Sequence, residues 1–359
     1  MANDGPTNTE PDWADVRKAY PAAVNSTYLN TPSAGAMANG TAEAAFNEQV
    51  LLMSEGASRF MQWMDHGRAE VLQVVAENLG TVIDQVALVP NFSKGAALLA
   101  PFLAHRPKVL VVNGDYPSLL APFEHPPFQR VVIDPLPDGS IPLELLESAI
   151  TRERPDIVAI SHVQWSTGFA IDLKAVAELC RRYNALSFFD ATQSWCCLPI
   201  DVVAMGIDVV GASGYKWALA GFGNGFLYVS ERTRAEVQQR SGRKLMGQLM
   251  LGHDDPVAFI RLKDALQRHA VLGPTAIRDR VHALCALTME ELDRIGIPVV
   301  NGRNVDGRSG FMIIAGGEER LRVMHEAEVH AARRGSGIRI GLHFYNSVED
   351  IHALVGALT

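Results

Sequence analysis

The amino-acid sequence predicts an α/β protein in which a mostly parallel, seven-stranded sheet lies between helices, followed by a smaller C-terminal α+β domain. Short, continuously apolar segments recur between residues 86 and 229, and helical stretches such as residues 173–183 separate most of them. Strands buried on both faces are continuously apolar, and their alternation with helices is typical of a parallel sheet. Beyond residue 243 the pattern changes to a long helical region, which indicates a second domain.

Before the sheet we expect three segments. Residues 1–25 are predicted to form a loose arm, and residues 28–30 an extended segment that ends at a proline and glycine turn. Helical periodicity then covers residues 41–79, with interruptions near Gly56 and Gly67.

The later elements follow from the same patterns. The predicted strands of the sheet are the apolar runs at residues 86–89, 109–112, 131–133, 157–160, 186–189, 209–211 and 225–229. After them we expect helices up to residue 292, strands at residues 298–300 and 311–314, and a final strand and helix. The predicted domains are therefore the N-terminal arm (1–25), a large domain (26–243) and a small domain (244–359).

Composition narrows the class of function. The chain has 359 residues, of which 48% are hydrophobic and 20% charged, so a sizeable core is expected. The net charge of -8 argues against nucleic-acid binding, and no apolar run approaches the ~18 residues of a membrane span. Four cysteines without metal-ligand spacing predict no metal site and a reducing, cytoplasmic compartment. A small molecule is the expected partner.

Asp190 and Lys216 suggest a particular chemistry. Asp190 ends an apolar run, so its carboxylate should emerge at the carboxyl edge of the sheet, where ligands bind. Lys216 follows the next strand and precedes a glycine-rich segment that lets a cofactor approach closely. An acid that keeps a pyridine nitrogen protonated, and a lysine that condenses with an aldehyde as a Schiff base, suit pyridoxal phosphate. A helix cap for Asp190 and an exposed surface position for Lys216 are the alternatives.

Several hydroxyl groups could hold the phosphate of such a cofactor. Ser93 and Lys94 lie between a predicted strand and an apolar helix, where backbone amides form an anion site. A helix cap without a ligand is the alternative there. Ser213 and Tyr215, which flank Lys216, offer two further hydroxyls.

Other residues could contact the cofactor ring. Tyr116 follows a strand and could stack on the ring, although a packed turn would also explain it. Gln193, three residues after Asp190, could hydrogen-bond the phenolic oxygen, or it could belong to the first turn of a helix. The segment after the strand at 157–160 adds three side chains that could flank the ring: His162, Gln164 and Trp165.

Arg339 lies inside an apolar strand near the C-terminus. A guanidinium group in such a place needs a planar anion, and the carboxylate of a substrate has the matching geometry. An internal salt bridge is the alternative. The turn that contains Thr31 and Ser33 is a further candidate for the carboxylate site.

In this order along the chain, from Tyr28-Leu29-Asn30 to Tyr345-Asn346, the segments resemble the class V aminotransferase branch of the fold type I pyridoxal phosphate enzymes. This branch includes cysteine desulfurases, kynureninases, isopenicillin-epimerase-like proteins and ergothioneine-pathway C–S lyases. The resemblance implies a homodimer. It also implies a role for each matching position: Lys216 as Schiff-base lysine, Asp190 as pyridinium partner, Gln193 at the phenolic oxygen, Ser93, Ser213 and Tyr215 at the phosphate, Tyr116 on the ring, and Arg339 at the substrate α-carboxylate.

The chain also departs from the family pattern. Cysteine desulfurases carry a nucleophilic cysteine shortly before the arginine strand, whereas this chain has no cysteine after Cys285. This argues against desulfuration through a persulfide. Residues 252–256 lack the Gly-Thr pair that often contacts the phosphate of the neighbouring subunit, so cross-subunit phosphate binding stays open. The aromatic Trp165 is more similar to kynureninase and epimerase-like members.

We therefore predict a pyridoxal phosphate enzyme that acts on an amino acid through an external aldimine and a Cα carbanion. In this prediction Lys216 releases the cofactor to the substrate amine and then moves the Cα proton. Transamination and β-elimination, including C–S cleavage, both fit. Epimerase-like and kynureninase-like reactions are alternatives within the family, and a catalytically silent ligand-binding protein is the alternative from a different class.

Overall fold

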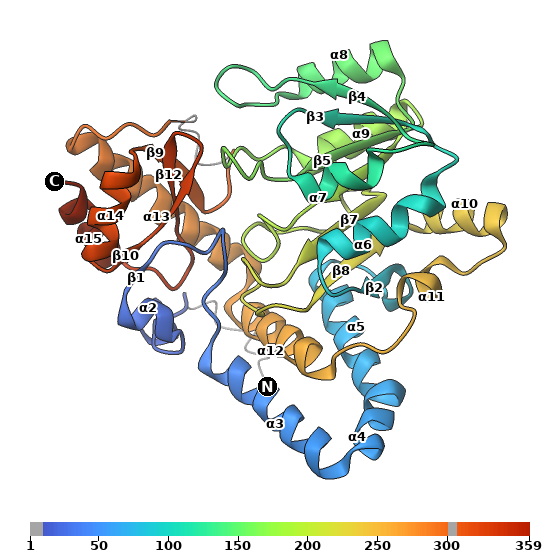
Figure 1. Ribbon diagram of the computed structural model, residues 1–359, viewed down its shortest axis with the longest axis horizontal. Coiled ribbons are helices and arrows are strands. Elements are labelled where there is room, and N and C mark those ends of the chain that lie inside the picture. The colour runs from blue at the N-terminus through green and yellow to red at the C-terminus, as the bar shows by residue number, and fades with distance from the viewer. Residues whose placement is uncertain (1–9, 301–306) are drawn as a thin grey trace, which may run out of the picture.

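A seven-stranded sheet forms the centre of the protein in the computed structural model, which describes residues 10–300 and 307–359 (Figure 1). Its strands are β2 (Val86–Leu88), β3 (Lys108–Val112), β4 (Gln129–Ile133), β5 (Ile157–Ser161), β6 (Leu186–Asp190), β7 (Val209–Ser213) and β8 (Gly225–Val229). The strand order is β2-β8-β7-β6-β5-β3-β4, and only β8 runs antiparallel to its neighbours. The prediction of a mostly parallel sheet of seven strands is confirmed.

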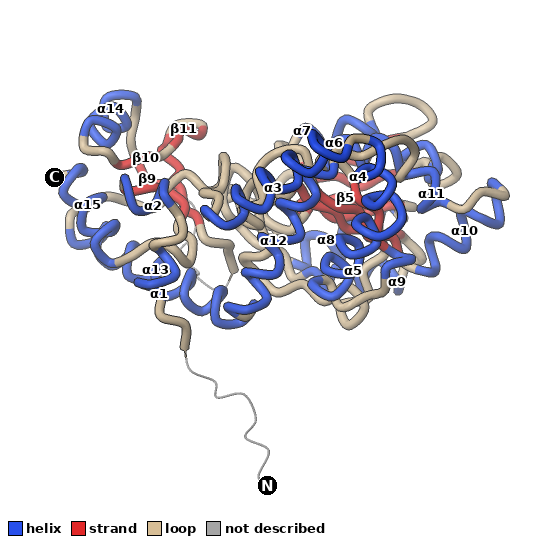
Figure 2. Tube along the Cα trace, turned by 90° about the horizontal axis from the view of Figure 1, so that it is seen from below, coloured by secondary structure: helices blue, strands red, loops and turns tan. Residues whose placement is uncertain are grey.

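Helices cover both faces of this sheet, as Figure 2 shows. One face carries α6 (Phe92–Leu99) and α7 (Pro117–Leu120); the other carries α5 (Arg68–Asn78), α8 (Leu143–Glu153) and α9 (Leu173–Arg182). Leu110 and Val112 pack into the core beneath α5, α8 and α9, whereas Val109 and Val111 pack into the core beneath α6 and α7. Because alternate side chains enter different cores, β3 is apolar from Val109 to Val112, and only its first residue, Lys108, is charged.

The helices before the sheet are interrupted near Gly56 and Gly67, as the sequence predicted. They are α3 (Asn39–Glu55), α4 (Ala57–Gln62), a π-helical turn (Trp63–Gly67) and α5. Gly56 has a φ of 55°, a left-handed conformation that most residues avoid, and it separates α3 from α4. α3 and α4 project from the lower side of the molecule in Figure 1.

The C-terminal part contains a second, three-stranded antiparallel sheet in the order β11-β12-β9. Its elements are α13 (Pro274–Arg294), β9 (Phe311–Ala315), α14 (Glu318–Glu326), β10 (Val329–His330), β11 (Ala332–Arg334), β12 (Gly337–Gly341) and α15 (Val348–Leu358). The strand predicted at residues 298–300 is only an isolated bridge between Val299 and Ile314. Beside this bridge, Val300 N donates to the carbonyl of Ile313 at 2.8 Å and Ala315 N donates to the carbonyl of Pro298 at 3.0 Å, so the segment lies against β9 without forming a regular strand.

The described part of the predicted loose arm is folded, so that prediction is wrong for residues 10–25. This segment forms α1 (Trp13–Arg17) and α2 (Pro21–Asn25), and β1 (Thr27–Tyr28) then pairs with β10. Tyr20 and Ala23 are buried in the C-terminal core, and Arg17 pairs with Asp350 at 2.6 Å. These contacts, which join residues more than 300 positions apart, leave no local sequence signal. The first nine residues lie outside the described residues.

The helices that follow β8 connect the two sheets. They are α10 (Glu231–Ser241), α11 (Leu245–Leu249) and α12 (Pro256–Leu272). α12 contacts α3 and α5, and its Phe259 and Leu262 belong to the core of the large sheet. The predicted domain boundary at residue 243 stays a prediction. None of the helices in the described chain is both long and apolar enough to cross a membrane.

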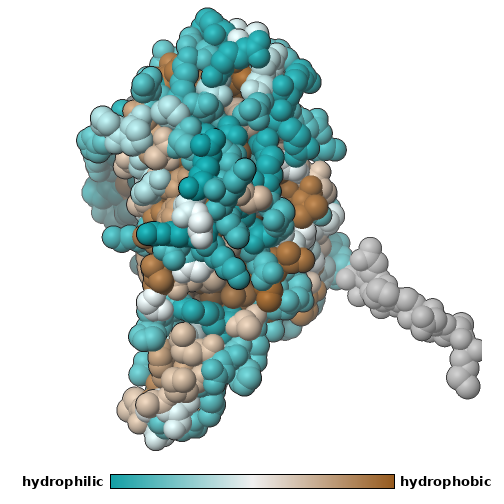
Figure 3. All heavy atoms as spheres, turned by 90° about the vertical axis from the view of Figure 1, so that its right-hand side faces the viewer, coloured by the Kyte–Doolittle hydropathy of each residue, from teal (hydrophilic) through white to brown (hydrophobic). Residues whose placement is uncertain are grey.

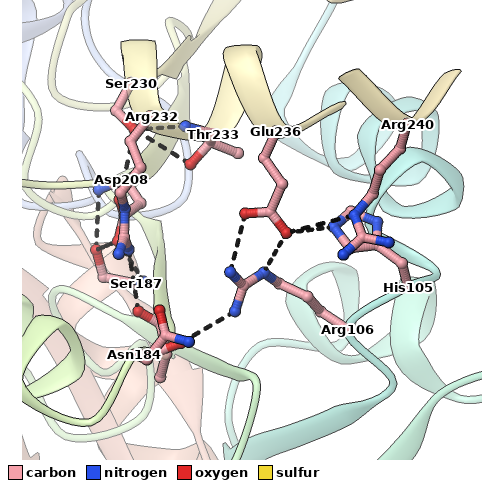
Figure 4. Close-up of polar contacts among 11 residues, drawn as sticks. His105, Arg106, Asn184, Ser187, Asp208, Ser230, Arg232, Thr233, Glu236 and Arg240 are labelled. Carbon is pink, nitrogen blue, oxygen red and sulfur yellow. Dashed lines mark hydrogen bonds and ion pairs between the residues drawn. The ribbon is translucent and has the colours of Figure 1, made fainter. Parts of the chain in front are cut away.

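A group of charged side chains lies at the amino ends of β3, β6 and β7, beside α10 (Figure 4). We call it the basal charge cluster: His105, Arg106, Asp208, Arg232 and Glu236. Arg232 donates to both carboxylate oxygens of Asp208, at 3.0 and 2.8 Å, and Arg106 does the same for Glu236, at 3.0 and 2.9 Å. These paired charges fasten α10 to the sheet.

Candidate active site

Asp190 and Lys216 come to the same edge of the sheet because they lie at and just beyond the carboxyl ends of adjacent parallel strands. Asp190 is the last residue of β6, and Lys216 lies in the loop directly after β7. Their exposed fractions are 4% and 5%. A surface position for Lys216 is therefore wrong, and Asp190 does not cap an α-helix, since residues 191–194 form a turn. Among the described residues no hydrogen bond or ion pair reaches Lys216 Nζ.

Both groups have shifted pKa values because they are buried. Burial raises the pKa of the Asp190 carboxyl, although hydrogen bonds from Thr192 and the charge of Lys216 oppose the shift. Burial lowers the pKa of the Lys216 ammonium; Asp190 opposes this, while Arg339 and Arg334 lower it further. Neither buried charge is fully compensated within the chain.

Asp190 lines a cavity of about 410 Å³; Lys216 is not among the lining residues, but both tyrosines whose rings its amine approaches, Tyr116 and Tyr215, line it. This volume is in the range of small-molecule sites. Six of the predicted cofactor residues line it: Ser93, Lys94, Tyr116, Asp190, Ser213 and Tyr215. The other six lining residues are not among the predicted site residues: Pro90, Asn91, Phe92, Thr192, Phe222 and Gly223.

One end of the cavity is formed by the N-terminus of α6. Asn91 caps this helix, since its side chain accepts a hydrogen bond from Lys94 N at 2.9 Å. The Ser213 hydroxyl accepts a hydrogen bond from Phe92 N at 2.9 Å, and Ser93 Oγ donates to Ser118 Oγ at 2.7 Å. Asn91 therefore caps the helix, and the same helix end also lines the cavity, so a helix cap and an anion site do not exclude each other here. The proton of the Ser213 hydroxyl has no acceptor among the described residues, so it can be donated to an anion.

Two tyrosines stand next to Lys216. Its Nζ atom lies 5.2 Å from the ring centroid of Tyr116 and 5.5 Å from that of Tyr215. Tyr215 stacks on Phe222 with 4.8 Å between centroids, and burial raises the pKa of Tyr215 to about 12. The tyrosines form aromatic walls around the lysine amine.

The two predicted glutamines are buried but bound to protein groups. Gln193 Nε2 donates to the carbonyl of Pro32 at 3.1 Å, and its Oε1 accepts from Trp217 Nε1 at 2.9 Å. Its second amide hydrogen stays available. Gln164 Nε2 donates to Asp115 at 3.1 Å, and Gln164 does not line the cavity.

Arg339 is a buried cation near Lys216 that has no carboxylate partner in the described chain. It is 2% exposed and donates hydrogen bonds to the Ser33 hydroxyl at 2.8 Å and to the Trp165 carbonyl at 3.4 Å, and its guanidinium carbon lies 5.6 Å from the ring centroid of Phe311. Its Nε has no hydrogen-bond partner, and no carboxylate within the described chain pairs with it. Burial and then the charge of Arg334 lower the pKa of Arg339 to about 9. The alternative of an internal salt bridge is wrong.

The predicted turn before α3 lies against these groups. Ser33 accepts the hydrogen bond from Arg339, and a side chain on Gly35 would collide with the carbonyl oxygen of Lys216. Thr31 is fully buried, and its hydroxyl is hydrogen-bonded to Tyr345. Since that hydroxyl is engaged, we leave Thr31 out of the proposed substrate site.

Two supporting residues were missed in the sequence. Thr192 donates its backbone N–H to Asp190 at 2.8 Å, and its hydroxyl accepts from Ser213 N at 3.2 Å, so it joins both strand ends. Asp115 accepts from Tyr116 N at 2.6 Å and from Gln164, and thereby orients both. The sequence could have pointed to Thr192 and Asp115 only through their positions, since each lies within two residues of a predicted site residue that follows or ends a strand. His162, by contrast, is held by Ser194 at 2.8 Å.

The residues present fit pyridoxal phosphate. A buried acid, an aromatic wall and a helix N-terminus line one cavity of suitable size, and the amine of the buried Lys216 lies within 5.5 Å of the centroids of the two tyrosine rings that line it. No group of three or more metal-ligating side chains occurs in the part of the chain that the structure describes. Fold and site together define a fold type I pyridoxal phosphate enzyme.

Comparisons with known proteins give the family. The family model described as "Aminotransferase class-V" matches residues 95–314, more than half of the chain, so the protein belongs to the class V aminotransferases. The "Uncharacterized aminotransferase YcbU" of Bacillus subtilis is 26% identical over 359 residues, covering 94% of this chain and 95% of that protein. A "Probable cysteine desulfurase" of Pyrococcus abyssi is 23% identical over 393 residues and 96% of both chains.

Solved structures agree on the fold. The apo cysteine desulfurase of Thermococcus onnurineus has a TM-score of 0.86 at 19% identity, covering 98% of this chain and 97% of that one. A C-DES variant with glycine covalently linked to its PLP cofactor has a TM-score of 0.85 at 18% identity, covering 97% of this chain and 99% of that one. At such identities the likeness concerns the fold.

Proposed function

We propose that this enzyme binds an α-amino acid through Arg339 and moves the Cα proton with Lys216, and that aminotransfer is its reaction. The observation that carries the proposal is the buried Arg339, which has no carboxylate partner in the described chain and whose charge acts on Lys216. A buried guanidinium without an anion is costly, so a ligand carboxylate explains it. In an α-amino acid the carboxylate is bonded directly to Cα. A carboxylate held by Arg339 would therefore keep Cα near the amine of Lys216.

Pyridoxal phosphate supplies an aldehyde that condenses with amines and a ring that withdraws electrons from Cα. The chain would hold it at both ends: Asp190 at the pyridine nitrogen, and Ser93, Lys94, Ser213 and Tyr215 with the α6 N-terminus at the phosphate. Tyr116 would contact the ring, and Gln193 would donate its remaining amide hydrogen to the phenolic oxygen. Gln164 would act more remotely, since Asp115 holds its amide.

Lys216 is suited to take up a proton near neutral pH. Burial lowers the pKa of its ammonium, so the neutral amine is more accessible than in an exposed lysine. The aromatic walls of Tyr116 and Tyr215 keep water from the amine. Arg339 would fix the substrate so that its Cα faces this amine.

Two observations support the proposal of aminotransfer over desulfuration. The chain has no cysteine after Cys285, and Cys285 itself is buried, with its pKa raised to about 12. A persulfide route needs an accessible thiolate. Of the two relatives described above that span nearly the whole chain, one carries the name aminotransferase and the other the name probable cysteine desulfurase, so the cysteines rather than these names support the preference. β-Elimination uses the same residues and remains the second candidate, to be separated by products.

Borohydride reduction tests the cofactor site directly. The native protein should retain a reduced cofactor on the peptide that contains Lys216, and Lys216→Ala should retain none. Lys174→Ala, on α9 away from the cavity, is the matched control and should behave as the native protein. Reduced cofactor on Lys94 or Lys174 in the native protein would show that Lys216 does not have this role.

A product assay tests the reaction. Purified protein is incubated with a panel of amino acids and thioether conjugates, with and without 2-oxo acids, and keto acid, new amino acid and thiol are measured. Aminotransfer requires a 2-oxo acid acceptor and gives a new amino acid in equal amount. Thiol or ammonia release without an acceptor would contradict aminotransfer and support elimination.

We also propose a homodimer in the cytoplasm. Apolar side chains are exposed along the projecting helices α3 and α4, where Figure 3 shows brown and tan residues at the lower end of the molecule: Phe46, Val50, Leu51, Met53 and Met61. Such a surface is typical of an interface. The four cysteines form no disulfide, as expected in a reducing compartment. Sedimentation of the native protein and of Phe46→Glu should give a dimer and a monomer, respectively.

A further inference from the structure

Arg334 lies on the same face of the small sheet as Arg339. In the ladder between β11 and β12, Ala332 pairs with Arg339 and Arg334 pairs with Gly337. Side chains two residues apart on a strand point the same way. Arg334 is therefore a diagonal neighbour of Arg339 on the face that meets the turn before α3.

Both guanidinium groups approach one hydroxyl. The Nη2 atom of Arg339 donates to Ser33 Oγ at 2.8 Å, and the Nη2 atom of Arg334 lies 3.4 Å from the same oxygen. Arg334 also donates a hydrogen bond to the carbonyl of its neighbour Arg333 at 2.7 Å, and its buried Nε has no hydrogen-bond partner. No carboxylate in the described chain forms an ion pair with either Arg334 or Arg339.

Arg333, the neighbour of Arg334 on the same strand, is an arginine with a structural role and provides a comparison. Its side chain points to the opposite face and forms an ion pair with Glu318 at 2.7 Å. The chain thus provides an acid for the arginine that is outside the site and none for the two inside it. Two like charges that share one hydroxyl repel each other, and an anion between or beyond them removes this cost.

We propose that Arg334 binds a second anionic group of the substrate, so that the enzyme acts on dicarboxylic amino acids and the corresponding 2-oxo acids. The inference rests on the proposed function for the assignment of Arg339 to the α-carboxylate. Arg339 is fully buried beside Lys216, whereas Arg334 is only partly buried, at the end of an edge strand. The outer arginine is thus placed to meet the far end of a substrate whose near end is held by Arg339.

Kinetics with matched substrates test this inference. Arg334→Gln should lower kcat/KM for aspartate or glutamate by about 10- to 100-fold, the effect of one lost charge-assisted hydrogen bond. The same variant should change kcat/KM for alanine by less than about threefold, because alanine has no second carboxylate. Arg333→Gln, the adjacent arginine outside the site, is the control and should leave all substrates unchanged.

A binding measurement keeps the inference testable without turnover. Calorimetry of the protein as purified should show that succinate or glutarate binds at least about tenfold more tightly than propionate or butyrate, and that Arg334→Gln removes this preference. Equal affinity of the wild type for mono- and dicarboxylates would overturn the inference. So would an equal loss for both classes in Arg334→Gln, which would mean that the two arginines share one carboxylate. If dicarboxylates bind as expected but no amino acid is converted, the proposed reaction fails while the anion site stands.

Discussion

Two buried aspartates lie at opposite edges of the central sheet and have different partners. Asp190 ends β6 and is 4% exposed, whereas Asp208 precedes β7 and is 5% exposed. Asp208 receives hydrogen bonds from Arg232 and from the backbone N–H and hydroxyl of Ser187. Asp190 receives hydrogen bonds from Thr192, and no cation lies within ion-pair distance of it in the described chain.

The same contrast separates the arginines. Arg106 and Arg232 in the basal charge cluster each make a bidentate pair with a carboxylate. Arg339, on β12 of the small sheet, has a hydroxyl and a carbonyl as its hydrogen-bond acceptors. Where a charge holds the fold together, the chain supplies the counter-charge. Where the counter-charge is missing, a ligand is expected to bring it.

The largest expected difference follows from removing the charge of Asp190. Asp190→Asn should lower turnover by on the order of 10²- to 10³-fold, because the neutral amide no longer stabilises a protonated pyridine nitrogen. The apo protein should melt at the same or a higher temperature. The raised pKa of Asp190 already includes the attraction of Lys216, so above that pKa the carboxylate costs stability that asparagine does not.

Steady-state kinetics and thermal melts of the cofactor-free protein check this prediction. The variant Ser166→Ala, which changes an exposed residue outside the cavity, provides a neutral reference. A marked loss of apo stability in Asp190→Asn would show that Asp190 is a structural acid like Asp208, and the comparison between the two edges would fail.

Arg339→Lys should give the next largest effect. A lysine keeps the charge but cannot make a planar, two-pronged contact with a carboxylate. Transition-state stabilisation should fall by about 2–3 kcal/mol, measured as kcat/KM for amino acids. Cofactor content, read from absorbance, should stay near that of the wild type. Failure to fold, or unchanged kcat/KM, would instead assign Arg339 a structural role.

The fold was predictable because its signals are local. Most strands of the sheet are predominantly apolar, because alternate side chains enter two different cores, as in β3. Gly56 marks a helix break by its left-handed backbone. The N-terminal helices were missed because Tyr20 and Arg17 are held by residues near the C-terminus, such as Phe344 and Asp350, which no local pattern reveals.

The site was predictable in its charged residues and less so in its supports. Lys216 and Arg339 stand out because charge in an apolar run is rare. Thr192 and Asp115 have ordinary roles in turns, so only their contacts show what they position. Arg334 adjoins the similar Arg333, and strand register alone tells which of the two faces the site. Register is set by tertiary pairing, not by composition.

Asp208→Asn applies the same substitution to the basal charge cluster, where the charges have a structural role. Loss of the charge leaves Arg232 without its ion pair and weakens the contacts to Ser187, so the free energy of unfolding should fall by about 2 kcal/mol. Urea unfolding measures this value. The folded fraction should keep the wild-type kcat, because the basal charge cluster lies at the opposite edge from Lys216. An effect on kcat without an effect on stability would reverse the comparison.

The smallest expected effect concerns Glu236 and depends on pH. Burial raises the pKa of this carboxyl, but hydrogen bonds from Arg106 and His105 outweigh burial and lower it overall. A depressed pKa means that Glu236 stabilises the fold above its unfolded pKa of about 4.3, and that this contribution is lost as pH falls through the folded value. Glu236→Gln should therefore cost about 1 kcal/mol near neutral pH and progressively less below about pH 4.5. Urea unfolding of both proteins across this range measures the difference, and a cost that does not shrink on acidification would show that the ion pairs of the basal charge cluster do not stabilise α10.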